Sequence, residues 1–471
     1  MGRINTTHAM TALCVALGLV LAAPATQADP DPQPQPIAAK SAAKTLTLER
    51  IELPADAKTT SAVIEGYLGL KPGDPLDQAR LRAGIDNLRA SGLVESVDFY
   101  TKRGSERGAL VLVLELRERG PGLRFGTGNS DLDGWYLIPA ELSLDNLTGR
   151  GELAALQLRF GYRLTGLSAH YLRGRNPHEK NLWGVRAHAL ALNHVYFDEG
   201  LEYAQPTVRG GADFHYGRKL GHGLSWTVGL KAETVEVDST GSVWQDDEFA
   251  GVSRDDDVPF EDLPAAIAAA VGRYERVAWR AELTLDRRSP RLRAGTPESG
   301  VWGRLRVESI RQKTIEEREG DRDERFGAAS LDFRAYRPLG SGVLAWSARG
   351  AVIGSEAFFP DRNYLGGLYT VRGFPSASLS GPGGARGLWC SSLEYRAPLS
   401  GNSARPRVAG SLFVDVGGQG ERGETAAVGA GWGLRIRAFD DWYLGADFAV
   451  PVSDSPVRES FHSHLSLGWR F

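Results

Sequence analysis

The last twelve residues, "SFHSHLSLGWRF" from Ser460 to Phe471, alternate almost throughout between polar and apolar side chains. The apolar positions are Phe461, Leu465, Leu467, Trp469 and Phe471, and the polar ones are His462, His464, Ser466 and Arg470. A period of two is typical of a β-strand with apolar surroundings on one side and polar surroundings on the other. The sequence therefore predicts a half-apolar terminal strand that ends on an aromatic residue.

The same alternation recurs in "ELAALQLRF" (152–160) and "GWGLRIRAF" (431–439), where arginines occupy the polar side. An arginine near the middle of a lipid-facing surface costs about 2–4 kcal/mol, whereas a water-filled interior tolerates it. These stretches therefore favour a membrane β-barrel with its apolar side in lipid. A soluble sandwich with a buried apolar face has the same alternation and stays open on this pattern alone.

The start of the chain predicts export. Arg3 precedes an apolar run at 10–23, and small residues suited to cleavage follow, which together predict a signal peptide over 1–28. Cys14 lies inside that run, so the mature chain keeps only Cys390 and has no internal disulfide. No later segment approaches ~18 apolar residues, the length of a membrane-spanning helix.

Composition narrows the class further. With 57 glycines in 471 residues and 42% hydrophobic residues, but few helical patterns after about residue 90, the exported chain is typical of an outer-membrane β-barrel of a Gram-negative bacterium. The alternative is a soluble secreted all-β enzyme. The balance of 55 basic and 58 acidic residues leaves no positive excess for nucleic acid.

From about residue 120 onward the pattern predicts a 16-stranded antiparallel barrel over 120–471. The expected strands are 121–129, 135–146, 151–163, 166–174, 181–198, 203–219, 222–238, 274–286, 298–315, 324–338, 342–355, 385–399, 406–417, 424–438, 440–452 and 460–471. An even number returns the C-terminus to the side where the barrel begins. Most turns on that side are short, with 287–297 as the exception.

Two long connections, 239–273 and 356–384, fall at the opposite end of the expected barrel, either outside it or folded into the lumen. In the first, "FEDLPAAIAAAVGRY" (260–274) is consistent with a short helix or with an irregular surface loop. The second contains "NYLGGLYTVRGF" (363–374), which places a cation beside paired glycines.

Residues 29–45 are rich in proline and then in alanine and lysine, which predicts a flexible linker. The pattern over 46–119 then predicts the order β-α-α-β-β, with "LRASGLVESVDFY" (88–100) joining the second helix to the second strand. This module resembles a POTRA (polypeptide-transport-associated) domain. An unrelated small α/β module of the same order is the alternative. An exposed edge strand in it would accept a client strand by β-augmentation.

Several stretches resemble the outer-membrane protein eighty-five superfamily, which includes BamA- and TamA-type insertases, two-partner secretion transporters and the bacterial surface antigens. They are "LDNLTGRGE" (144–152), "LTLDRRSPRLRAGTPESG" (283–300), "NYLGGLYTVRGF" (363–374), "GLWCSSLEYRAPL" (387–399), "GSLFVDVGGQG" (410–420) and "LSLGWRF" (465–471). Together with the module they cover nearly all of 46–471, in the order that the family has them.

The resemblance implies that the signature loop, with Arg372, Gly373 and Phe374, folds into the barrel and contacts an acidic residue of the inner wall. That residue would be Asp415, with Glu394 as a second candidate. Alternation independently directs both carboxylates to the lumen, because each is flanked by apolar neighbours that point the other way.

The resemblance also implies two further sites. Asp286, Arg288 and Pro290 correspond to a family turn between strands eight and nine. Leu465, Leu467, Trp469 and Phe471 correspond to a C-terminal signal for insertion into the outer membrane.

Nothing in the sequence supports covalent chemistry or a cofactor, and we expect a protein that is not an enzyme. "GLSAH" (166–170), the nearest match to a nucleophile elbow, ends in histidine and lies in an expected strand. His462 and His464 are favoured as lumenal polar residues over metal ligands. The acidic stretch 246–257 lacks the ligand spacing of a calcium loop.

The resemblance implies a protein that inserts client polypeptides into the outer membrane or translocates them across it. In this hypothesis a periplasmic POTRA module captures unfolded clients, the first and last strands separate laterally, and outer-membrane lipids and accessory periplasmic or lipoprotein subunits are partners. Glycines within 121–129 favour a labile seam. The alternatives are a two-partner secretion transporter with one dedicated client, and a passive porin or surface protein.

Overall fold

The computed structural model describes residues 46–471 except 121, 126–135, 162–163, 175–178, 248–251, 290–295, 316–322, 402–405, 421–425, 440–441, 455–460 and 468–471. The signal peptide and linker expected over 1–45 lie outside the described residues. In the described part, no helix is both long and apolar enough to cross a membrane.

The first elements have the expected order β-α-α-β-β: β1 (Thr47–Glu52), α2 (Ser61–Leu68), α3 (Gln78–Ala90), β2 (Val94–Arg103) and β3 (Ala109–Glu118). They form a three-stranded sheet with β3 in the centre, parallel to β1 and antiparallel to β2. The side chain of Asp77 caps α3 by accepting a hydrogen bond from the Ala79 amide at 3.1 Å. Gly84 lets α3 approach the backbone of Leu68 at the end of α2. Apolar residues of both helices and the sheet form one core.

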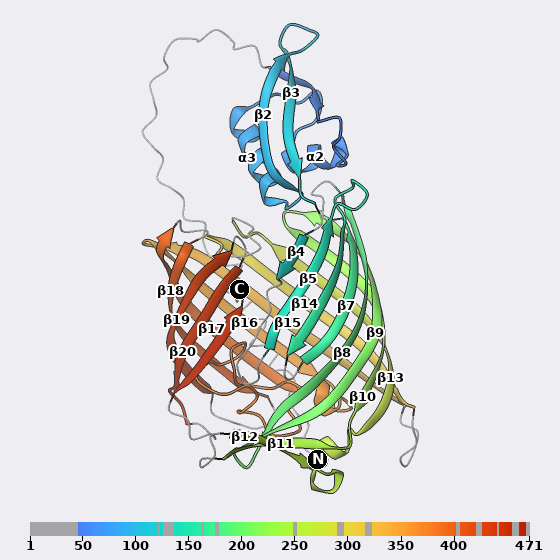
Figure 1. Cartoon of the computed structure of the whole chain (residues 1–471), viewed down its shortest axis with the longest axis vertical. Coiled ribbons are helices and arrows are strands. Elements are labelled where there is room, and N and C mark those ends of the chain that lie inside the picture. Colours follow the sequence, from blue (N-terminus) through green and yellow to red (C-terminus); the bar gives the residue numbers. More distant parts are fainter. Residues whose placement is uncertain are drawn as a thin grey trace. The chain divides into compact units, whose positions relative to one another are not determined.

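The remaining strands form a closed antiparallel barrel (Figure 1). The wall strands are β4 (Gly122–Phe125), β5 (Tyr136–Asp145), β6 (Leu153–Gly161), β7 (Leu164–Arg173), β8 (Asn181–Asp198), β9 (Leu201–Gly221), β10 (Leu224–Val237), β13 (Gly272–Asp286), β14 (Gly300–Thr314), β15 (Asp323–Leu339), β16 (Gly342–Ile353), β17 (Gly387–Gly401), β18 (Pro406–Gln419), β19 (Ala427–Phe439), β20 (Trp442–Pro451) and β21 (His462–Leu467). Because β10 pairs with both β9 and β13, these sixteen strands make the ring, and β21 and β4 close it.

The alternation of side chains matches the two faces of this wall. On the outer face, Trp279 is 64% exposed and Leu412 is also 64% exposed, and many other strand leucines and valines are exposed with them. On the inner face, polar residues such as Arg435 and His464 are buried. An apolar exterior around a polar interior is the arrangement of a transmembrane barrel and not of a soluble sandwich.

The connection between β10 and β13 holds more structure than the sequence predicted. It contains a β-hairpin, β11 (Gly241–Asp247) and β12 (Val252–Val258), which pairs with the extended end of β9. A single 3₁₀ turn (Phe260–Asp262) and a short helix, α4 (Ala265–Ala268), follow. The helical alternative for 260–274 is therefore confirmed for residues 265–268, while 272–274 belong to β13. The hairpin escaped prediction because its strands are mostly polar.

Candidate functional site: a loop docked inside the barrel

The connection between β16 and β17, residues 354–386, lies against the inner wall, and we call it the lumenal loop. Apart from the 3₁₀ turn Phe359–Asp361 it has no regular secondary structure. Its apolar side chains are nevertheless buried: Leu368, Val371 and Phe374 have no exposed surface. An irregular segment buried to this degree is held by specific contacts.

Arg372 makes the central contact. Its Nε donates to Oδ2 of Asp415 at 2.7 Å, its Nη2 donates to Oδ1 at 2.9 Å, and its backbone amide donates to Oδ2 at 3.1 Å. Neither side chain is exposed to solvent. The structure thus brings these two residues together as a buried bidentate pair, the geometry in which a guanidinium binds a carboxylate most directionally.

Two further carboxylates surround the same guanidinium. Glu394 lies 3.3 Å from Nη2, and Asp447 lies 3.6 Å from Nη1. Each is also paired with a wall arginine, Glu394 with Arg396 at 2.9 Å and Asp447 with Arg435 at 2.6 Å. Three arginines therefore face three carboxylates, and the buried cluster carries no net charge.

The local electrostatics keep Arg372 ionised. Burial alone lowers the pKa of Arg372, but Asp415, Glu394 and Asp447 raise that pKa by more, so the net shift is upward. The guanidinium also lies over the ring of Phe413, with Cζ 3.2 Å from the ring centroid, and Nη2 donates to Oγ of Ser392 at 3.2 Å.

Glycines on the wall make room for the loop backbone. Gly429, Gly431 and Gly433 occupy successive inward-facing positions of β19, opposite Asp415, Phe413 and Ser411 of β18. A Cβ atom on Gly429 would overlap the carbonyl oxygen of Arg372. The loop therefore rests on the backbone of β19 at Gly429, whereas Gly431 and Gly433 leave room for Phe413, Asp447 and Arg435. We call these three positions the glycine strip.

The second half of the signature motif reaches the last strand. Gly373 has a φ of 95°, and its amide donates to Nε2 of His464 on β21 at 3.4 Å. His464 is fully buried, and its ring lies 4.6 Å from that of His462. Phe374 packs in an apolar cluster with Leu365 and Val371.

In the described part of the chain, no group of three or more His, Cys, Asp or Glu side chains is arranged to hold a metal ion. Of the two histidines of β21, His464 contacts the loop through the Gly373 amide.

The other residues singled out from the sequence lie elsewhere. Asp286 accepts two hydrogen bonds from the Arg288 side chain, both at 2.9 Å, at the end of β13, whereas Pro290 lies outside the described residues. Leu465 is 42% exposed on the outer face. Leu467 ends β21, and Trp469 and Phe471 lie outside the described residues.

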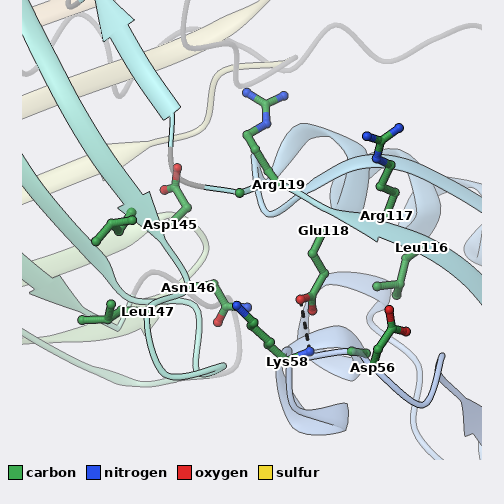
Figure 2. Close-up of a pocket in the computed structure, with 12 residues that line it drawn as sticks. Asp56, Lys58, Leu116, Arg117, Glu118, Arg119, Asp145, Asn146 and Leu147 are labelled. Atoms are coloured by element: carbon green, nitrogen blue, oxygen red, sulfur yellow. Dashed lines mark hydrogen bonds between the residues drawn. The ribbon is translucent and has the colours of Figure 1, made fainter.

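A second polar site joins the first barrel turn to the 46–119 module. The Asn146 side chain donates to Oγ1 of Thr59 at 2.7 Å, and the carboxylate of Glu118 accepts from the backbone amides of Lys58 and Thr59. A cleft of about 440 Å³ lies beside these contacts, with Lys58, Glu118 and Arg119 in its lining (Figure 2). Of these contacts, the Asn146–Thr59 bond joins the two parts, whereas those of Glu118 lie within the module.

Four contributors to the loop site were missed from the sequence: Asp447, Ser392, His464 as a loop partner, and the glycine strip. Alternation in β20 places Asp447 on the inner face, and "GAGWG" (429–433) repeats glycine at every second position. Both signals are present in the sequence, but a local pattern shows only which face a residue lies on and does not identify its contact partner.

A family model, the Omp85 superfamily domain, matches residues 146–471. A sequence search of the curated proteins found no match.

Among solved structures, the chain is similar to BamA from Haemophilus ducreyi lacking POTRA domains 1–3 (14% identity, TM-score 0.57, covering 91% of this chain and 85% of that one). It is also similar to CdiB from Escherichia coli (13%, 0.56, covering 90% and 76%) and CdiB from Acinetobacter baumannii (15%, 0.51, covering 90% and 74%). At this level of identity the likeness shows the fold alone.

Proposed function

Because the chain belongs to the Omp85 superfamily, an outer-membrane β-barrel family, we propose that it assists the insertion or translocation of client polypeptides at the outer membrane. The observation that carries this proposal is the lumenal loop, which occupies the inner wall through a buried Arg372–Asp415 pair. A loop held in the lumen by a buried ion pair narrows the pathway through the barrel, which suits a barrel that must change its shape to pass a client. We therefore assign the loop the role of bracing the wall.

Client capture is assigned to the 46–119 module, which we interpret as a POTRA domain in the periplasm. Strand β2 lies at one edge of its sheet, and Phe99 and Tyr100 on this strand are 38% and 44% exposed. The opposite edge, β1, is partly covered by backbone hydrogen bonds with residues 73–76. An edge with aromatic side chains suits an extended unfolded segment, which would add as a further strand.

Client release is assigned to the seam between β21 and β4. The His464–Gly373 hydrogen bond supports this assignment, because it links the seam strand to the loop that carries Arg372. Movement of the loop would therefore act directly on β21, one of the two strands that form the seam.

The decisive experiment is deletion of the gene followed by quantitative proteomics of the outer membrane and of the secreted fraction. Loss of many barrel proteins supports an insertase, and loss of one protein supports a dedicated transporter. No change in either fraction would overturn the proposal. Complementation with wild-type protein and with Arg372→Ala then tests whether the braced loop is required.

The seam is tested by cysteine pairs placed between 122–125 and 462–467, in a Cys390→Ser background. If oxidation leaves client assembly at the wild-type level while the crosslink forms quantitatively, lateral opening is wrong. A pair placed between the neighbouring strands β6 and β7, at the facing positions Gln157 and Ser168, is the matched control.

Two other functions remain as alternatives. A two-partner secretion transporter would export one client through the lumen. A porin or surface protein would keep the barrel without handling clients. A large steady conductance in planar bilayers favours the porin, whereas small flickering conductance favours a barrel with a docked loop.

A further inference from the structure

A second buried ion cluster holds the other end of the lumenal loop. Oδ2 of Asp361 lies 2.7 Å from Nη2 of Arg276, and Oδ1 accepts a hydrogen bond from Nη2 of Arg209 at 3.1 Å. The same Arg209 nitrogen also donates to the carbonyl oxygen of Pro360 at 3.0 Å. The Arg276 side chain is 4% exposed, and that of Asp361 is 15% exposed. We call this cluster the outer anchor, and Arg372 with its three carboxylates the inner anchor.

Apolar packing fixes the same end of the loop. Phe359 is 2% exposed and belongs to a cluster with Tyr196, Ile267 and Tyr274. This cluster includes residues from the β11–β12 hairpin and from α4, so it joins the loop to the long connection between β10 and β13. Asp361 is thus held by both charge and packing.

The two anchors attach to different parts of the ring. Arg209 and Arg276 belong to β9 and β13, the two neighbours of β10. The carboxylates of the inner anchor lie on β17, β18 and β20, and His464, which binds the neighbouring Gly373, lies on β21. In the ring order, six strands separate β10 from β19 on one side and eight on the other. The two anchors therefore hold opposite walls.

We propose that Asp361 is a positioning residue and that the lumenal loop is a strut between opposite walls of the barrel, held at both ends by buried ion clusters. Each anchor alone keeps the loop in the lumen, and loss of both releases it. This strut is a property of the barrel itself, so it can be tested without any client polypeptide and independently of the proposed function.

The charges explain why Asp361 matters to this strut. Arg276 has one other acidic neighbour, Glu233, at 4.0 Å, and Glu233 lies closer to Lys231, at 2.6 Å. Removal of the Asp361 charge would leave Arg209 and Arg276 facing each other with little compensation. Repulsion between the buried Arg276 guanidinium and the partly buried Arg209 guanidinium then favours movement of the loop away from this wall.

The test uses the full-length protein refolded into planar bilayers. For Asp361→Asn we expect brief openings with an open probability raised about tenfold, the factor that corresponds to roughly 1.4 kcal/mol of docking free energy. Asp361→Glu should return conductance toward wild type. The double variant Asp361→Asn/Arg372→Lys should show a sustained open state that neither single variant shows. A merely structural defect would not produce this pattern.

Asp323→Asn is the matched control, because its pair with Arg311 is exposed and lies outside both anchors. It should conduct like wild type. If Asp361→Asn fails to fold, as judged by heat-modifiable migration in gels, Arg209→Gln replaces it. This variant removes the hydrogen bonds from Arg209 to Asp361 and to the Pro360 carbonyl and so weakens the outer anchor, while Arg276 still compensates the Asp361 charge. Wild-type conductance in a folded variant of either kind, or a double variant no more open than Arg372→Lys, would overturn the proposal.

Discussion

Both anchors hold a charged residue of the lumenal loop against the barrel wall, but with opposite signs of charge. At the inner anchor the loop supplies the cation, Arg372, and the wall supplies three carboxylates. At the outer anchor the loop supplies the anion, Asp361, and the wall supplies two arginines. In both, the wall carries more partners than the loop charge needs. A buried charge with several partners is costly to remove from its site, so the loop position is strongly specified.

The anchors differ in their surroundings. The inner one rests on bare backbone at Gly429, whereas the outer one is supported by the aromatic cluster around Phe359. The inner anchor therefore depends on close approach, and the outer anchor on apolar packing. The two ends of the loop should therefore respond to different substitutions.

Arg372→Ala should have the largest effect. It leaves Asp415, Glu394 and Asp447 buried with only the two wall arginines, and breaking a buried ion pair from one side costs about 3–5 kcal/mol. We expect a loss of this size in the free energy of unfolding, measured by urea titration in lipid vesicles. Protease cleavage should appear near residue 372 and not near 361, because the outer anchor remains.

Asp415→Ala is the companion variant. Because the two residues form one unit, the double variant should lose less than the sum of the two single losses. Additive losses would mean that the pair does not act as the inner anchor.

Gly429→Ala should come next. Its methyl group would overlap the Arg372 carbonyl oxygen, and overpacking of a close contact costs about 1–3 kcal/mol, here at the upper end because backbone must move. Gly350→Ala is the control, since its nearest atom would be 3.9 Å away. Equal stability of the two variants would refute the role of the glycine strip.

Glu394→Gln should have a smaller effect, at the lower end of the roughly 1.5–3 kcal/mol given for hydrogen bonds to charged groups. Arg372 keeps its bidentate bond to Asp415, while Arg396 loses its charged partner. Unfolding titrations of Glu394→Gln beside Asp415→Asn measure the difference. A larger loss for Glu394→Gln would reverse the ranking of the two carboxylates.

Asp286→Asn should have the smallest effect. Asp286 and Arg288 are 27% and 19% exposed, so solvent partly screens their pair, and solvent-screened ion pairs at a surface contribute at most about 1 kcal/mol. The same titration should show a change below about 1 kcal/mol, with unchanged protease cleavage of the loop. Cleavage at 372 in this variant would indicate that the turn and the loop are coupled.

Most of the barrel was predictable because its signal is local. Alternation with a period of two marks each wall strand, and the strand number and order match the structure. Boundaries differ by a few residues, as at β9, which extends to Leu201. The β11–β12 hairpin was not predictable in this way, since its strands are mostly polar, with Val243 and Val258 as isolated buried apolar residues, and β11 pairs with β9.

The site was predictable only in part. Parity directed Asp415 and Glu394 inward, and the family resemblance suggested Arg372 as their partner. Asp361 could not be found, because its partners Arg209 and Arg276 lie more than eighty residues away in the sequence and each looks like an ordinary lumenal cation. The contacts of Asp361 with Arg209 and Arg276 form only when the strands close into a ring, and no local sequence pattern predicts which residues then meet.

The glycine strip of β19 has a consequence for transport through the barrel. Gly429 has no side chain, so this part of the wall presents peptide backbone once the lumenal loop has left it, whereas the space beside Gly431 and Gly433 stays filled by Phe413, Asp447 and Arg435. Water would enter first at the gap beside Gly429, because peptide groups hydrate readily. Hydration of the released barrel would therefore begin at the wall, two strands away from β21 and the seam.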